Sequence, residues 1–207
     1  DREIIDASPV ATLKASKICT GLTPNTRSRV LSEAEIKTLW TLTHPPSGMQ
    51  TVTLVALQMI LLSGQRPGEV AGMQWDEIQG GMWTIPPERR GKTQDAHTVP
   101  LTATARKLLD RTGGAGAYVF TARDGRPIGA TAVARAVRRC GDRLGSEAPL
   151  WRPHDLRRTM RTGLATAGIP EHVAELTIGH TRKGIAAVYD QHRYLAEKRE
   201  ALELWER

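Results

Sequence analysis

The stretch MQTVTLVALQMILLSGQRPGEV, residues 49–70, decides the fold class. Its first part is apolar on almost every side and predicts a buried helix over Met49–Leu62. Gly64 and Pro67 then interrupt the pattern, so a short second helix is expected after them. The longest apolar run, Thr51–Leu62, contains Gln58 and is too short to span a bilayer, which argues against a membrane protein.

Outward from this stretch, the remaining pattern is mostly helical. Ser32 and Glu35 form a capping box that predicts a helix over Glu33–Leu42. Further helices are expected at Thr102–Arg111, Ala130–Leu144, His154–Ala167, Pro170–Ile178, Lys183–Tyr189 and Arg193–Trp205. Short β-like runs occur at Gly72–Ile78, Met82–Ile85 and Ala96–Leu101, with another at Tyr118–Thr121. The sequence therefore predicts a mainly α domain with a small three-stranded antiparallel sheet.

Charge is distributed unevenly along the 207 residues, whose net charge is +7. Residues 1–103 hold ten Lys and Arg against ten Asp and Glu, whereas residues 104–207 hold nineteen against twelve. Arginine outnumbers lysine by 22 to 7, and its planar fork suits bidentate contacts with phosphate. The basic half points to a nucleic-acid partner, with a solvated basic surface as the alternative.

The rarer residues limit the cofactor classes. Cys19 and Cys140 are too few and too far apart for a disulfide framework or a cysteine-rich zinc site, which favours a reducing, intracellular compartment. The histidines form no HxH or HExxH pattern, and neither a Walker loop nor a GxGxxG motif occurs. We expect no cofactor and no metal.

Two segments combine an arginine with a helix start. Arg66 precedes Pro67 and Glu69, which places its side chain where an anion is favoured, although an Arg66–Glu69 surface ion pair is the alternative. His154 and Arg157 share one face of a helix that begins near Pro153. An imidazole that moves protons beside a guanidinium that neutralises phosphate oxygens suits phosphoryl transfer, whereas a capping histidine with a solvated arginine is the alternative.

Three further residues could complete such a site. Tyr189 lies nine residues after His180, and a tyrosine becomes a covalent nucleophile only beside a base and a positive charge. Tyr194 is a rival nucleophile, and a core position for Tyr189 is the alternative. Lys92 lies in the polar loop 88–95, from which a lysine can give a proton to a leaving oxygen.

Five blocks in chain order resemble the catalytic domain of the tyrosine recombinases, most of all prophage and genomic-island integrases of the P4 type. The blocks are Ser63–Glu69 (SGQRPGE), Lys92 with His97–Leu101 (HTVPL), His154–Thr159 (HDLRRT), Ile178–His180 (IGH) and Tyr189. The likeness covers about Val30–Trp205. Ser63 stands where the family usually has Thr, Ile178 where Leu is common, and an extra Gly91 precedes Lys92.

The resemblance implies a role for each matching residue. It makes Arg66 and Arg157 the phosphate clamps, Lys92 the general acid for the leaving 5′ oxygen, His154 and His180 proton-handling and phosphate-binding groups, Tyr189 the nucleophile, and Glu69 a brace. The implied activity is site-specific DNA recombination through a 3′-phosphotyrosyl intermediate, which integrates or excises a mobile element. A type IB topoisomerase-like enzyme and a catalytically idle DNA-binding module remain alternatives.

The resemblance also implies an organisation and partners. Residues 1–29 resemble a linker and the tail of a core-binding domain that is not in this sequence, and residues 30–207 form the catalytic domain. The partners would be double-stranded DNA attachment sites, other copies of the chain in a synaptic tetramer, and accessory directionality and DNA-bending proteins, at the nucleoid in a bacterial cytoplasm. The apolar stripe of Arg193–Arg207 includes Trp205, and we expect this helix to dock in trans on a neighbouring protomer rather than in cis.

Overall fold

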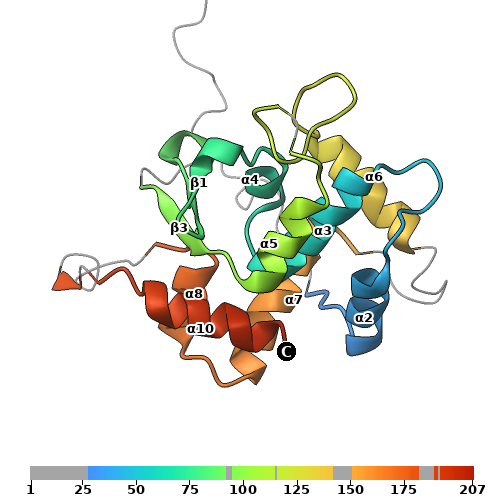
Figure 1. Ribbon diagram of the computed structural model, residues 1–207. Coiled ribbons are helices and arrows are strands. Elements are labelled where there is room, and N and C mark those ends of the chain that lie inside the picture. Colours follow the sequence, from blue (N-terminus) through green and yellow to red (C-terminus); the bar gives the residue numbers. More distant parts are fainter. Residues whose placement is uncertain (1–27, 92–94, 115, 142–150, 182–188, 191) are drawn as a thin grey trace, which may run out of the picture.

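The computed structural model describes residues 28–91, 95–114, 116–141, 151–181, 189–190 and 192–207. Helices dominate this part of the chain, and the fold class predicted from the sequence is confirmed (Figure 1). In chain order the elements are α2 (Glu33–Thr41), α3 (Thr51–Ser63), α4 (Pro67–Ala71), β1 (Ile78–Gln79), β2 (Met82–Ile85), β3 (His97–Pro100), α5 (Ala103–Asp110), α6 (Ala130–Gly141), α7 (Pro153–Thr166), α8 (Glu171–Thr177) and α10 (Leu195–Trp205).

The apolar helix α3 forms the centre of the core. It packs against α4, α5, α6 and α7, and eleven of its thirteen residues are buried, as its even apolar pattern predicts. Gly64 ends the helix with a positive φ of 66°. A Cβ at Gly64 would lie 2.7 Å from Sδ of Met160, so α7 approaches the end of α3 closely. This contact brings Arg66 and the helix that carries Arg157 to the same place.

The sheet is a three-stranded antiparallel meander in the order β1-β2-β3, with Trp83 opposite Val99 and Ile85 opposite His97. Its first strand is shorter than predicted. Over the predicted run Gly72–Ile78 the chain forms a 3₁₀ turn at Trp75–Glu77, because Glu77 accepts hydrogen bonds from the backbone N–H of Gln74 and from the Trp83 indole.

The predicted strand Tyr118–Thr121 is also wrong. Within the described ranges, isolated bridges form there instead, Gln74 with Tyr118 and Thr121 with Pro127. The chain turns back directly after Thr121, since the Ala122 backbone N–H donates to the carbonyl oxygen of Arg126 at 2.7 Å. The helix predicted at Ala130–Leu144 is described as far as Gly141, and residues 142–144 lie outside the described part. All but the last residue of the helix predicted at Lys183–Tyr189 also lies outside it.

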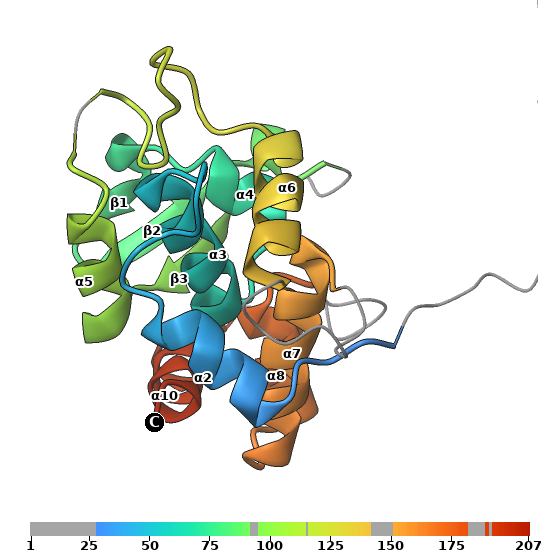
Figure 2. The same cartoon turned by 90° about the vertical axis from the view of Figure 1, so that its right-hand side faces the viewer.

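The C-terminal helix α10 packs in cis. It contacts α8, β3, α7 and α3 of its own domain (Figures 1 and 2). The indole N–H of Trp205 donates to the carbonyl oxygen of Leu61 at 3.0 Å, and its ring fills the space that Gly163 leaves open. The expectation that Trp205 is exposed unless a neighbouring protomer covers it was therefore wrong, because α3 and α7 cover it within the single chain. Docking of α10 in trans in the assembled synapse stays a prediction.

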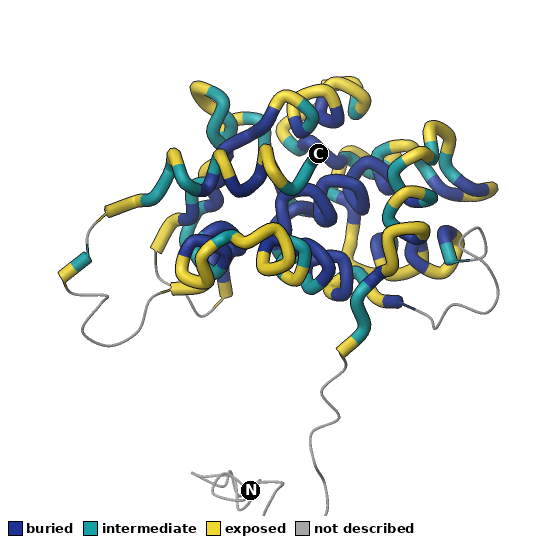
Figure 3. Tube along the Cα trace, turned by 90° about the horizontal axis from the view of Figure 1, so that it is seen from below, coloured by how far each residue is buried: buried dark blue, intermediate teal, exposed yellow. Residues whose placement is uncertain are grey.

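The buried residues lie where the helices and the sheet pack against one another. Seen from below, the buried segments gather in the interior and the exposed segments form the rim (Figure 3). Among the described helices, none combines the length and the apolar character that crossing a membrane requires.

Candidate active site

Arg66 and Glu69 form a rigid unit at the start of α4. Glu69 is buried, and its carboxylate accepts from the Arg66 backbone N–H at 2.8 Å and from Nη1 of the same residue at 2.7 Å. The Arg66 side chain keeps 35% of its surface exposed. The ion pair considered in the sequence analysis therefore exists, but its acid lies in the interior and orients a guanidinium that still reaches solvent.

Arg157 lies one turn into α7 and is almost fully buried, with 3% of its surface exposed. Its Nη1 donates to the carbonyl oxygen of Gly64 at 2.8 Å. Its Nη2 is buried without a hydrogen-bond partner among the described residues. Burial, and then the charge of Arg66, lowers the pKa of the guanidinium to about 10. A buried cation with an unused donor is an energetic cost that a bound anion would relieve.

His154 stands one helical turn before Arg157, in the first turn of α7, and its ring is exposed. Partial burial, and then the charges of Arg157 and Arg158, lower the pKa of the imidazole. The neutral ring is favoured, so this group is able to accept a proton at neutral pH. Asp155 caps the helix by accepting from the Arg152 backbone N–H at 2.8 Å, which fixes the turn that carries His154.

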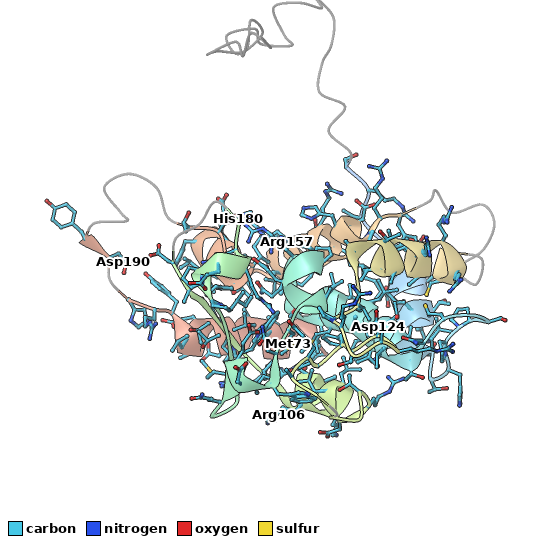
Figure 4. All side chains as sticks on the ribbon, turned by 90° about the horizontal axis from the view of Figure 1, so that it is seen from above. Met73, Arg106, Asp124, Arg157, His180 and Asp190 are labelled. Carbon is cyan, nitrogen blue, oxygen red and sulfur yellow. The ribbon has the colours of Figure 1, made fainter. Side chains whose placement is uncertain are left out.

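His180 follows the end of α8, where Gly179 turns the chain with a φ of +78°. The Nδ1 atom of His180 forms a hydrogen bond with the Glu175 carboxylate, which also accepts from Nε of Arg161 at 2.6 Å. Although burial works in the opposite direction, these two hydrogen bonds hold the pKa of the Glu175 carboxyl below its usual value. Figure 4 shows His180 and Arg157 near each other on one side of the molecule.

The structure thus brings four predicted residues and Glu69 together, and it leaves Tyr189 apart. Tyr189 is 82% exposed, and Figure 4 shows its chain neighbour Asp190 at the edge of the molecule, far from Arg157. Lys92 lies outside the described residues. Within the described ranges, no group of three or more His, Cys, Asp or Glu side chains is arranged to hold a metal ion.

Two residues of this region escaped the sequence analysis. Arg90 is buried beside the site, and its charge helps to lower the pKa of Arg157. Glu175 orients His180. Both had a weak signal in the sequence: Arg90 stands two residues before Lys92, and Glu175 lies on the helix that ends at the IGH block.

Comparison with known proteins shows the family to which the chain belongs. Residues 29–195 match the sequence model of the Phage integrase family. The chain belongs to this family. It is 30% identical over 165 residues to "Prophage integrase IntA" and 30% identical over 152 residues to "Prophage integrase IntZ", both of Escherichia coli strain K12. These matches cover 76% and 70% of the chain but only 38% and 36% of the relatives, so the chain spans less than two fifths of their length.

Solved structures of integrases share the fold. The integrase from mycobacterium phage Brujita superposes with a TM-score of 0.70 at 16% identity, over 88% of this chain and 60% of that one. The lambda integrase catalytic core superposes with a TM-score of 0.58 at 20% identity, over 77% of this chain and 95% of that one. The family resemblance and the fold expected from it are therefore confirmed.

Proposed function

We propose that the protein is a site-specific DNA recombinase that integrates or excises a mobile element. The observation that carries this proposal is the convergence of Arg66 and Arg157, one oriented by a buried carboxylate and the other buried with a free donor, beside two histidines. Such a cluster is suited to a phosphodiester, since preorganised cations stabilise charge on its nonbridging oxygens. Membership of the Phage integrase family supports this function over a type IB topoisomerase or an idle binding module.

The first chemical step is attack by the Tyr189 hydroxyl on the scissile phosphorus. The P–O5′ bond breaks, a 3′-phosphotyrosyl bond forms, and the 5′ oxygen leaves as a hydroxyl after taking a proton from Lys92, the general acid that the resemblance implies. His154 has a lowered pKa and is available to accept the phenolic proton. A 5′-hydroxyl of a partner duplex then attacks the phosphotyrosine and restores the tyrosine. Because the covalent link retains the bond energy, the cycle needs neither ATP nor a metal.

The exposed position of Tyr189 adds a requirement. The tyrosine has to approach Arg157 and His180 for attack in line with the 5′ oxygen. Because its side chain is 82% exposed, little packing against the described residues would oppose this movement. We infer that DNA, together with neighbouring protomers, selects the arrangement in which the tyrosine reaches the phosphate.

DNA binding is supported by a basic groove beside the candidate active site. The groove lies between α6 and the start of α7, and it is lined by Thr131, Ala134, Arg135, Arg138, Trp151, Arg152 and Pro153. Arg152 precedes His154 by two residues, so a duplex that presents a phosphate to His154 would also pass the arginines of α6. We infer that these arginines neutralise flanking phosphates.

The wider assembly follows from the proposed activity. We infer that the duplexes are attachment sites and that four copies assemble on them, with accessory directionality and DNA-bending proteins. Structural neighbours include a lambda integrase tetramer bound to a Holliday junction and a Tn1549 transposon integrase in complex with transposon right-end DNA. The proposed organisation keeps residues 1–29 as linker and core-binding tail and residues 30–207 as the catalytic domain, acting at the nucleoid in the bacterial cytoplasm.

A nicked suicide duplex tests the proposed activity. The duplex carries the attachment site of the element that encodes the chain. A nick a few nucleotides to the 3′ side of the scissile phosphate lets the short fragment that carries the new 5′-hydroxyl diffuse away. We expect a covalent protein–DNA band that survives denaturation, forms in the presence of EDTA and disappears after protease treatment. A band that requires a metal, or no band on a duplex that the protein binds, would contradict the proposal.

A further inference from the structure

Arg90 is a buried arginine that joins two distant parts of the candidate active site. It follows the 3₁₀ turn Pro87–Arg89 after β2, and 5% of its surface is exposed. Its Nη1 donates to the carbonyl oxygen of Asp95 at 2.6 Å, and its Nη2 donates to the carbonyl oxygen of Gly179 at 2.6 Å. Because Gly179 immediately precedes His180, the second bond holds the backbone that carries the catalytic histidine.

We propose that Arg90 is a positioning residue of the active site, which holds His180 in place through the Gly179 carbonyl. The inference rests on the proposed function, since it assumes that His180 acts on the scissile phosphate. Arg90 itself is not assigned a contact with DNA, because two of its terminal donors bond to backbone carbonyls and its side chain is buried.

The packing around Gly179 supports this assignment. Nε2 of His97, on β3, lies 3.3 Å from the carbonyl oxygen of Thr177. A Cβ at Gly179 would lie 2.9 Å from Cδ2 of His97 and 3.3 Å from Nη2 of Arg90, so a larger residue would displace one of these side chains. The turn between α8 and His180 is therefore built against Arg90 and His97.

Among the described residues, α8 also holds His180 through Glu175. Its backbone N–H donates to the carbonyl oxygen of Glu175 at 2.9 Å, and its ring bonds to the Glu175 carboxylate. Glu175 thus sets the orientation of the ring, whereas Arg90 joins the turn to the chain between β2 and β3. Removing Arg90 would loosen the turn at Gly179, while the contact of His97 with the Thr177 carbonyl and the contacts of α8 remain.

A planar guanidinium suits this task better than an ammonium. Its planar fork can bond two carbonyls that approach from different chain segments. Here one carbonyl belongs to Gly179, 89 residues after Arg90, and the other to Asp95, five residues after it. Burial, together with the charge of Arg66, lowers the pKa of Arg90.

A double-mutant cycle tests the inference on the full chain. The measured quantity is the single-turnover rate of covalent complex formation on the suicide duplex. Arg90→Gln should lower this rate by up to about 100-fold, since a displacement of ~1 Å in a catalytic group can cost that much. In a His180→Ala background the same change should cost no more than about twofold, because the group it positions is already absent. In a His154→Ala background the full loss should persist.

Controls separate positioning from general damage. Arg111→Gln removes an arginine that also bonds two oxygens, the side-chain oxygen of Gln58 and the carbonyl oxygen of Thr43, and it should leave the cleavage rate unchanged. Arg90→Lys keeps the charge but cannot bond both carbonyls at once, so it should show a smaller loss than Arg90→Gln and the same dependence on His180. If Arg90→Gln does not fold, the double-mutant cycle of Arg90→Lys with His180→Ala tests the inference instead.

Several outcomes would overturn the inference. An equal loss in the native and His180→Ala backgrounds would assign Arg90 a general structural role, as would unfolding of both Arg90 variants. A native rate in Arg90→Gln would also refute it. If His180→Ala alone cleaves at the native rate, the proposed role of His180 fails and the positioning role falls with it. Loss of the covalent band in every protein, native included, would instead refute the proposed function.

Discussion

The Nη1 atom of Arg157 donates to the carbonyl oxygen of Gly64, 93 residues earlier in the chain and two residues before Arg66. One hydrogen bond therefore joins the two segments that supply the candidate phosphate clamps. The same guanidinium is buried, and its Nη2 has no partner among the described residues. Stability and activity should consequently respond in opposite directions when Arg157 is replaced.

Arg157→Met should stabilise the fold and impair cleavage. Removing a buried, incompletely bonded charge should raise the free energy of unfolding by about 1 kcal/mol, even though the Gly64 carbonyl loses its donor. The cleavage rate should fall by about 10²–10³, as for the loss of one preorganised donor. Urea unfolding and the suicide-duplex assay measure the two effects. A destabilised variant with near-native cleavage would refute the assignment of Arg157 as a clamp.

Gly163 should tolerate no larger side chain while Trp205 is present. An alanine in the interior of a helix normally stabilises it by about 1 kcal/mol relative to glycine. Here a Cβ would lie 2.0 Å from the Trp205 ring, so Gly163→Ala should lower the free energy of unfolding instead. The double variant Gly163→Ala with Trp205→Leu should recover part of the loss in urea unfolding. A stabilised single variant would show that α10 does not pack in cis.

Stability should fall on acidification because of His97. Burial, and then the charges of Lys198 and Arg90, lower the pKa of His97 well below its usual 6.5 in the folded chain. The unfolded chain therefore binds a proton first, so stability is complete above about pH 6.5 and is lost as the pH falls toward the folded pKa. Between pH 7.5 and 5.5 the loss should be about 1 kcal/mol by urea unfolding. His97→Gln should reduce this pH dependence; an unchanged slope would contradict the assignment.

Arg138 should contribute to DNA affinity through charge alone. Each neutralised phosphate adds about −0.9 to the slope of log affinity against log salt, so Arg138→Ala should make that slope shallower by about 1 on every duplex tested. Arg106→Ala is the matched control, because Arg106 is exposed on α5 and lies on the opposite side from Arg157 in Figure 4. If both substitutions change the salt dependence of DNA affinity equally, the proposal that the α6 groove contacts DNA is wrong.

Local interactions explain what could be predicted from the sequence. The N-terminal starts of α2 and α4 could be predicted, because their capping contacts lie within one helical turn. These contacts join Ser32 to Glu35 and Arg66 to Glu69. The even apolar pattern of α3 likewise predicts its burial. The prediction of the first strand was wrong over most of its length, because the Glu77 carboxylate accepts hydrogen bonds from the Gln74 backbone N–H and the Trp83 indole. Strand propensity does not take such side-chain hydrogen bonds into account.

Long-range contacts explain what could not be predicted. The bond between Arg90 and Gly179 joins residues 89 positions apart, and the bond between Trp205 and Leu61 joins residues 144 apart. Neither pairing leaves a periodic signal, so Arg90 was missed and Trp205 was assigned to a neighbouring protomer. Both bonds form only when α7, α8 and α10 pack against the rest of the domain, so they can be identified from the structure and not from the sequence.

The identity of the nucleophile is the most direct test of the account. After cleavage of the suicide duplex, nuclease and protease treatment leaves one tyrosine peptide that carries a 3′-linked nucleotide, and mass spectrometry identifies the residue. The account predicts the adduct on Tyr189, its loss in Tyr189→Phe with DNA affinity nearly unchanged, and its retention in Tyr194→Phe. An adduct on Tyr194, or a covalent complex that persists in Tyr189→Phe, would contradict it.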